Sequence, residues 1–230
     1  MANEPPTGRN ARETPGRIPS TINAEGAVLA AAAIVFFAGS AVLTRSGQPG
    51  ASTPVPWMAS HFLWVVATGL AAVGIAALYR RREAFGGGLA GPVAAGAFGL
   101  AVLDALQWTA WVYVDIFARQ EGAHESLHGP LLHPFGTGHA LMYGVLVGLA
   151  VASLAWAVDR SRPTHWLLTY GGLAVGTATA VVAAVAIVTV ADVREPASLA
   201  TVVLLAASWG WLLAAGVALG RDGPGGSPAR

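Results

Sequence analysis

Histidines and glutamates concentrate in one short stretch of the chain, between Gln120 and His139. The histidines are His124, His128, His133 and His139, and the glutamates are Glu121 and Glu125. Spacings of three and four residues place Glu121, His124, Glu125 and His128 on one face of a helical turn. Imidazole is the commonest metal ligand, and nitrogen and oxygen donors suit zinc, copper or iron. The stretch therefore predicts a transition-metal site with these four histidines as ligands, and a solvated polar loop is the alternative.

Part of this stretch also matches a catalytic pattern. His124-Glu125-Ser126-Leu127-His128 reads H-E-x-x-H and resembles the zincin metalloproteases, in which both histidines bind zinc and the glutamate is the general base. The resemblance covers five residues and implies zinc-dependent proteolysis. Gly129 and Pro130 follow at once and end the helix that would hold the ligands in register. We therefore interpret the stretch as a metal-binding loop rather than a protease site.

His61 and His139 form a second candidate pair. Each lies near the start of a long apolar run, where an imidazole can meet water at a membrane surface. If the two runs face each other in a helical bundle, the two histidines would hold a b-type haem or join the loop histidines on a metal. The alternative is two interfacial histidines without a cofactor.

Asp104 is an acidic residue deep inside an apolar run. A charge at the membrane midplane costs about 2.5–3.5 kcal/mol on insertion scales, so Asp104 must face the protein interior. Gln107 lies one turn away, and no apolar run contains a lysine or an arginine. Asp104 and Gln107 therefore predict a proton or cation site, and a neutral carboxyl bonded to a neighbouring helix is the alternative.

Six apolar runs carry these residues. Each has the roughly 20 residues that a helix rising about 1.5 Å per residue needs to cross about 30 Å of hydrocarbon. The runs are Ala24–Thr44, Ala59–Tyr79, Gly91–Tyr113, Gly136–Val158, Leu167–Val190 and Leu199–Gly220. The sequence predicts an all-α integral membrane protein with one membrane domain over residues 24–220, between disordered tails at 1–23 and 221–230.

Arginine placement predicts the orientation of the six helices. Ten of the 13 arginines lie in the two tails and in the gaps after the second and fourth runs, and one lies in each remaining gap. The positive-inside rule then places both termini in the cytoplasm of a multi-pass protein of the cell membrane. Five of the six histidines would face outside. In a rival interpretation, the first run is a signal peptide cleaved near Ala38-Gly39-Ser40, which leaves five helices.

Two further patterns concern how the helices pack. His61 and His139 lie 78 positions apart, and Asp115 and Asp192 lie 77 apart, at corresponding places of two helical hairpins. This spacing favours a duplicated hairpin, in which runs two and three are repeated as runs four and five, and chance is the alternative. Closely spaced glycines predict close helix contacts, and they are Gly91, Gly96, Gly99, Gly144, Gly148, Gly172 and Gly176.

Composition excludes several classes of function. The net charge is +1 with no basic stripe, which gives no case for a nucleic-acid partner. The chain has no cysteine, so disulfides, thiolate metal sites and cysteine nucleophiles are excluded. The expected partners are the lipid bilayer and either a second copy of the chain or a membrane complex. Three candidate functions follow. The first is an outer-face histidine site that binds a metal or haem for redox chemistry, sensing or metal handling. The second is a small proton- or cation-coupled transporter at Asp104, and the third is an accessory subunit without chemistry of its own.

Overall fold

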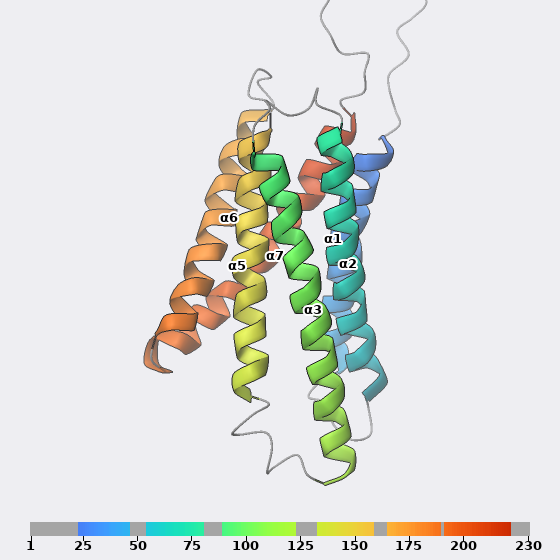
Figure 1. The fold of residues 1–230 in the computed structure, drawn as a ribbon, viewed down its shortest axis with the longest axis vertical. Helices are drawn as coiled ribbons and strands as arrows, with labels where there is room; N and C mark the ends of the chain where they lie inside the picture. Colours follow the sequence, from blue (N-terminus) through green and yellow to red (C-terminus); the bar gives the residue numbers. More distant parts are fainter. Residues whose placement is uncertain are drawn as a thin grey trace, which may run out of the picture.

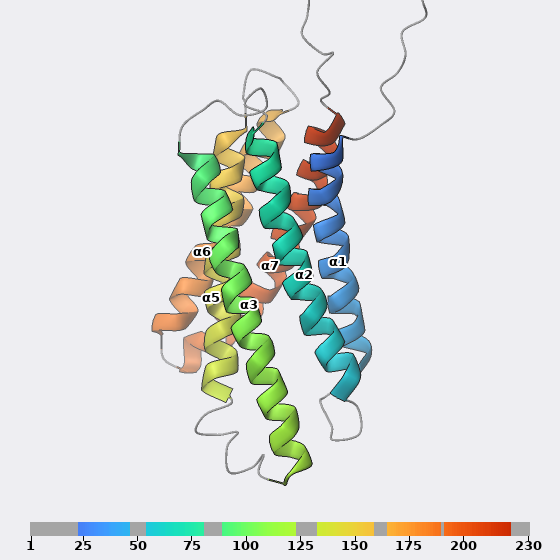
Figure 2. The same ribbon diagram turned by 45° about the vertical axis from the view of Figure 1, so that its right-hand side comes forward.

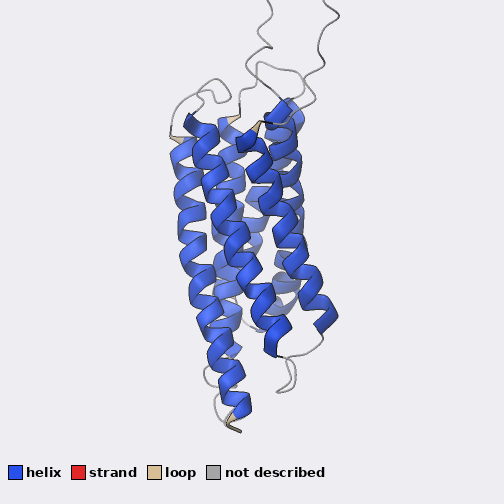
Figure 3. Cartoon of the chain, turned by 90° about the vertical axis from the view of Figure 1, so that its right-hand side faces the viewer, coloured by secondary structure: helices blue, strands red, loops and turns tan. Residues whose placement is uncertain are grey.

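The computed structural model describes residues 23–46, 54–80, 89–122, 133–158, 165–189 and 191–221, and these form six helices and no strand (Figures 1 and 3). The helices are α1 (Ala24–Ser46), α2 (Pro54–Arg80), α3 (Ala90–Gln120), α5 (His133–Ala157), α6 (His165–Val188) and α7 (Ala191–Arg221). Each is long and apolar enough to cross a membrane. The protein is therefore a multi-pass helical membrane protein, in which each helix satisfies its own backbone hydrogen bonds within hydrocarbon.

Each predicted apolar run falls on one helix, and the differences lie at the ends. Helix α3 continues to Gln120, well past Tyr113, and α7 begins at Ala191 rather than near Leu199. Polar residues can continue a helix beyond the hydrocarbon, so an apolar run marks the span and not the whole helix. The first run forms an unbroken helix through Ala38, Gly39 and Ser40. The predicted tails lie outside the described residues.

The helices form a closed ring in chain order. Each of α1, α2, α3, α5 and α6 packs against the next helix, α7 packs back against α1, and α7 also touches α5 across the ring. Helix α7 runs obliquely, from the end of α6 at one end of the bundle to the start of α1 at the other (Figures 1 and 2). Trp209 and Trp211 of α7 consequently lie in the protein interior, only 0% and 8% exposed.

Asn23 closes the ring at one end. Its backbone N–H donates to the Gly220 carbonyl at 2.7 Å, and its side-chain amide donates to the Leu219 carbonyl at 3.4 Å. Its side-chain oxygen accepts from the Gly26 N–H at 2.9 Å and so caps α1. We call this end of the bundle the terminal end, and the opposite end, where α1 stops and α2 starts, the distal end. Which end faces the cytoplasm stays a prediction, as does the duplicated hairpin.

Glycines set a close backbone contact between α5 and α6. A Cβ atom added to Gly148 would lie 2.5 Å from the backbone nitrogen of Ala180. A Cβ atom added to Gly176 would lie 2.5 Å from the backbone nitrogen of Ala152. Backbone therefore faces backbone at this crossing, and no residue larger than glycine fits without moving a helix.

The other predicted glycine contacts divide into two groups. Gly91, Gly144 and Gly172 each face side chains of another helix at close range, as expected. The prediction is wrong for Gly96 and Gly99, because a Cβ atom on either would have nothing within 4 Å. A close crossing that the sequence analysis missed joins α1 to α7, where Gly26 and Gly216 face each other.

Candidate functional site

Asp104 of α3 and His139 of α5 meet inside the bundle. His139 Nδ1 lies 3.0 Å from Asp104 Oδ1, and the two side chains are only 13% and 10% exposed. One proton joins the two atoms, carried by the nitrogen when the carboxyl is ionised and by the oxygen when it is neutral. Asp104 therefore faces the interior, as predicted, and its partner is an imidazole from the neighbouring helix.

The second carboxyl oxygen of Asp104 is also enclosed. Oδ2 is buried and has no hydrogen-bond partner among the described residues. A buried carboxyl oxygen without a partner costs free energy, because it has lost its bonds to water. Such an oxygen is suited to holding a proton or a cation inside the protein.

A pair of hydroxyl groups lies one turn along α5 from His139. Tyr143 Oη and Thr68 Oγ1 of α2 are 2.7 Å apart. Thr68 donates its own proton to the Trp64 carbonyl at 2.7 Å, so the proton between the two hydroxyls comes from Tyr143. Tyr143 is 3% exposed, and its oxygen offers only acceptor lone pairs to the rest of its surroundings. Thr68 was not predicted from the sequence, because its partner lies 75 positions away.

His61 lies in an aromatic enclosure near the distal end. Its ring centroid lies 5.5 Å from that of Trp57, 5.0 Å from that of Trp64 and 5.3 Å from that of Trp108. His61 is 2% exposed, and its Nδ1 lies 2.8 Å from the Trp57 carbonyl. Since a carbonyl only accepts, Nδ1 carries the proton of this hydrogen bond. Trp108 lies one turn from Asp104 on α3, so the enclosure adjoins the Asp104–His139 pair.

The remaining predicted site residues are Gln107 on α3 and the metal-site histidines His124, His128 and His133. Gln107 is exposed, and its part in an ion site stays a prediction. His124 and His128 lie outside the described residues; His133 opens α5, but its side chain is not among those described. In the described part of the chain, no three histidine, aspartate or glutamate side chains are placed to hold one metal ion. The metal site at His124, His128, His133 and His139 and the haem site at His61 and His139 stay predictions.

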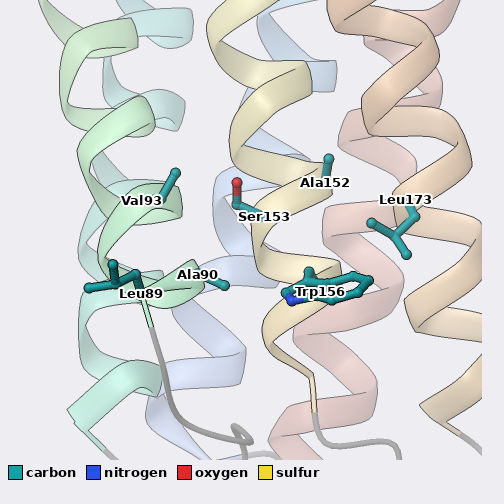
Figure 4. A pocket seen from close by; sticks show the side chains of 7 residues that line it. All are labelled: Leu89, Ala90, Val93, Ala152, Ser153, Trp156 and Leu173. Carbon is teal, nitrogen blue, oxygen red and sulfur yellow. The ribbon is translucent and has the colours of Figure 1, made fainter.

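A groove on the outer surface of the bundle is separate from these residues. It lies between α3, α5 and α6 near the terminal end, has a volume of about 260 Å³, and is lined mainly by apolar side chains such as Leu89, Val93 and Leu173 (Figure 4). Trp156 also lines it. None of the residues that line it belongs to the Asp104–His139 pair.

The chain matches no protein-family model, no curated protein and no solved structure. The fold and the site therefore define the protein by themselves. It is a multi-pass helical membrane protein with a carboxyl–imidazole pair enclosed between two of its membrane-spanning helices.

Proposed function

We propose that the protein moves protons, or a cation coupled to protons, across the membrane, with Asp104 and His139 as the binding site. One observation carries this proposal, the 3.0 Å contact between Asp104 and His139 inside two membrane-spanning helices. Ionisable side chains within a membrane are costly, face the protein interior, and mark ion pathways and proton relays.

The arrangement of the pair suits reversible binding. Asp104 and His139 belong to different helices, α3 and α5, so a small relative movement of these helices would lengthen their hydrogen bond. An imidazole beside a carboxylate changes the affinity of that carboxylate for a proton or a cation. Two helix positions would therefore give the site two affinities, which is what transport requires.

Asp104→Asn should abolish this transport while leaving the fold intact. Asparagine keeps the hydrogen-bonding shape of aspartate but cannot be ionised. We expect proton flux into vesicles that contain the purified variant to fall to the level of empty vesicles. A pH-sensitive dye inside the vesicles measures the flux.

Asp115→Asn on the same helix is the matched control. Asp115 lies near the distal end of α3 and forms an ion pair at 3.1 Å with Arg119, which follows it by one turn on the same helix. This variant should transport as the unchanged protein does. Full transport by Asp104→Asn would reduce Asp104 to a structural carboxyl and refute the proposal.

The second candidate function is the metal or haem site. The observation that favours it is that His139 contacts Asp104 through Nδ1, which leaves Nε2 as the atom that would bind a metal. A carboxylate at Nδ1 orients an imidazole, as in many metal sites where the metal binds at Nε2. The remaining ligands would come from His124, His128 and His133.

Replacement of both His128 and His139 by alanine should remove any bound metal or haem and leave the helical content unchanged. The two residues would belong to one centre, so neither alone would hold the ion at full occupancy. Elemental analysis and an optical spectrum of the purified protein measure this directly. Unchanged metal content in the double variant would refute the shared site, and the absence of both metal and transport would favour an accessory role.

A further inference from the structure

The polar groups of the site follow one another from the distal end toward the middle of the bundle. Along α3, Trp108 beside His61 comes first and Asp104 follows one turn deeper. Along α5, His139 is followed one turn deeper by Tyr143 with its partner Thr68. These groups form a continuous series of polar and aromatic side chains that begins near the distal end.

An aromatic layer lies directly beyond this series. Phe36 of α1 stacks on Trp209 of α7, with ring centroids 4.5 Å apart and planes 9° apart. The ring centroid of Phe98 of α3 lies 6.0 Å from that of Trp209, and the two ring planes are 67° apart. Trp209 adjoins Tyr143, and Phe98 lies six residues, or about 9 Å, from Asp104 along α3. We call Phe36, Phe98 and Trp209 the aromatic layer.

The bundle beyond the aromatic layer is packed with apolar side chains. Many apolar residues of the terminal half are no more than 2% exposed, among them Leu29, Ile75, Leu78, Ala94, Val151, Leu154, Val158, Leu212 and Leu219, and the polar Thr169 is also buried there. A proton or a hydrated ion that reaches Tyr143 from the distal end therefore meets aromatic and then aliphatic side chains. Hydrophobic constrictions of this kind block ions because water does not wet them.

We infer that Phe36, Phe98 and Trp209 are the barrier of the transport path, so that in this conformation the Asp104–His139 site is open toward the distal side only. This inference rests on the proposed function. It adds the point at which the path is closed and names the residues that close it. Trp209 is the central member, because both phenylalanines contact it and it fills the ring interior from α7.

Helix α7 is suited to open this barrier. It crosses the bundle obliquely, and it contains Pro196, which cannot donate a backbone hydrogen bond to the turn before it (Figure 2). A bend of α7 there would move Trp209 away from Phe36 and Phe98, which belong to other helices. The proton would then gain access to the terminal side.

Trp209→Ala should therefore make the protein leak protons. We expect the passive proton flux into reconstituted vesicles, driven by a potassium diffusion potential, to rise about tenfold or more over the unchanged protein, because the dry constriction is lost. Trp211→Ala is the matched control. Trp211 is also buried in α7, but its indole N–H donates to the Leu168 carbonyl and its ring packs on Gly172, away from the aromatic layer.

Three outcomes decide the inference. A leak in Trp209→Ala but not in Trp211→Ala supports the barrier. A folded Trp209→Ala protein as tight as the unchanged one, or equal leaks in both variants, overturns it. If Trp209→Ala does not fold, Phe98→Ala takes its place, and it should leak protons while Trp211→Ala does not.

Adding Asp104→Asn to Trp209→Ala separates this inference from the proposed function. If the leak then stops, the path runs through Asp104 and both proposals stand. If the leak continues, the aromatic layer is still the barrier, but the path does not use Asp104 and the proposed site is wrong.

Discussion

Gly176→Leu should prevent the six-helix domain from folding. The first added carbon would already lie 2.5 Å from the Ala152 nitrogen and 2.7 Å from the Gly148 carbonyl oxygen. Both are backbone atoms, so no side-chain rotation relieves the clash and α5 must separate from α6. Overpacking by even small groups costs about 1–3 kcal/mol, and a leucine against backbone should exceed that. Size-exclusion chromatography and thermal unfolding of the purified variant measure the loss.

Gly96→Leu is the control for this prediction. Gly96 is exposed on α3, and a Cβ atom there would have nothing within 4 Å. The leucine would point toward lipid, where an apolar side chain is well accommodated, so the variant should unfold at the same temperature as the unchanged protein. A stable Gly176→Leu protein would mean that α5 and α6 do not cross at these glycines.

His139→Leu should lower the unfolding free energy by about 3 kcal/mol, because it leaves a buried carboxyl without its partner. The double variant Asp104→Leu/His139→Leu should recover most of that loss. Two leucines need no hydrogen bond and fill similar volume, and apolar replacement of a buried pair is often neutral or stabilising. Reversible unfolding in detergent micelles measures both variants.

The decisive quantity is the interaction between the two substitutions. We expect the losses of the two single variants to sum to clearly more than the loss of the double variant, since the residues are in contact. Strictly additive losses would show that Asp104 and His139 do not interact. The double variant should be stable but inactive in the flux assay, which would separate the stability of the pair from its proposed role.

The spans were predictable because hydrocarbon thickness imposes a length on every apolar run. The cost of a charge at the membrane midplane also required Asp104 to face inward, and its side chain is 10% exposed. The helix ends were less predictable, since polar residues such as Asp115 and Arg119 continue α3 with an ion pair of their own. Nothing in the apolar pattern marks where such a helix stops.

The partners within the site were not predictable, because they depend on which helices become neighbours. Sequence spacing placed Asp104 with Gln107 and His139 with the loop histidines. The ring order instead sets α3 against α5, and Asp104 meets His139. Tyr143 lies one turn after His139 on α5, and its hydroxyl bonds Thr68 on α2. Only the packing of the bundle brings these helices to one point.

The closure of the ring by α7 has a consequence for biosynthesis. Asn23 and Leu219, which meet at the terminal end, are 196 positions apart, and α7 is the last of the six helices to leave the ribosome. The nascent chain therefore holds α1 to α6 in the bilayer as an open arc. The Asp104–His139 pair can form at that stage, because α3 and α5 are already inserted. Phe36 and Phe98 can contact Trp209 only after α7 has been made, so the Asp104–His139 pair can form before the aromatic layer does.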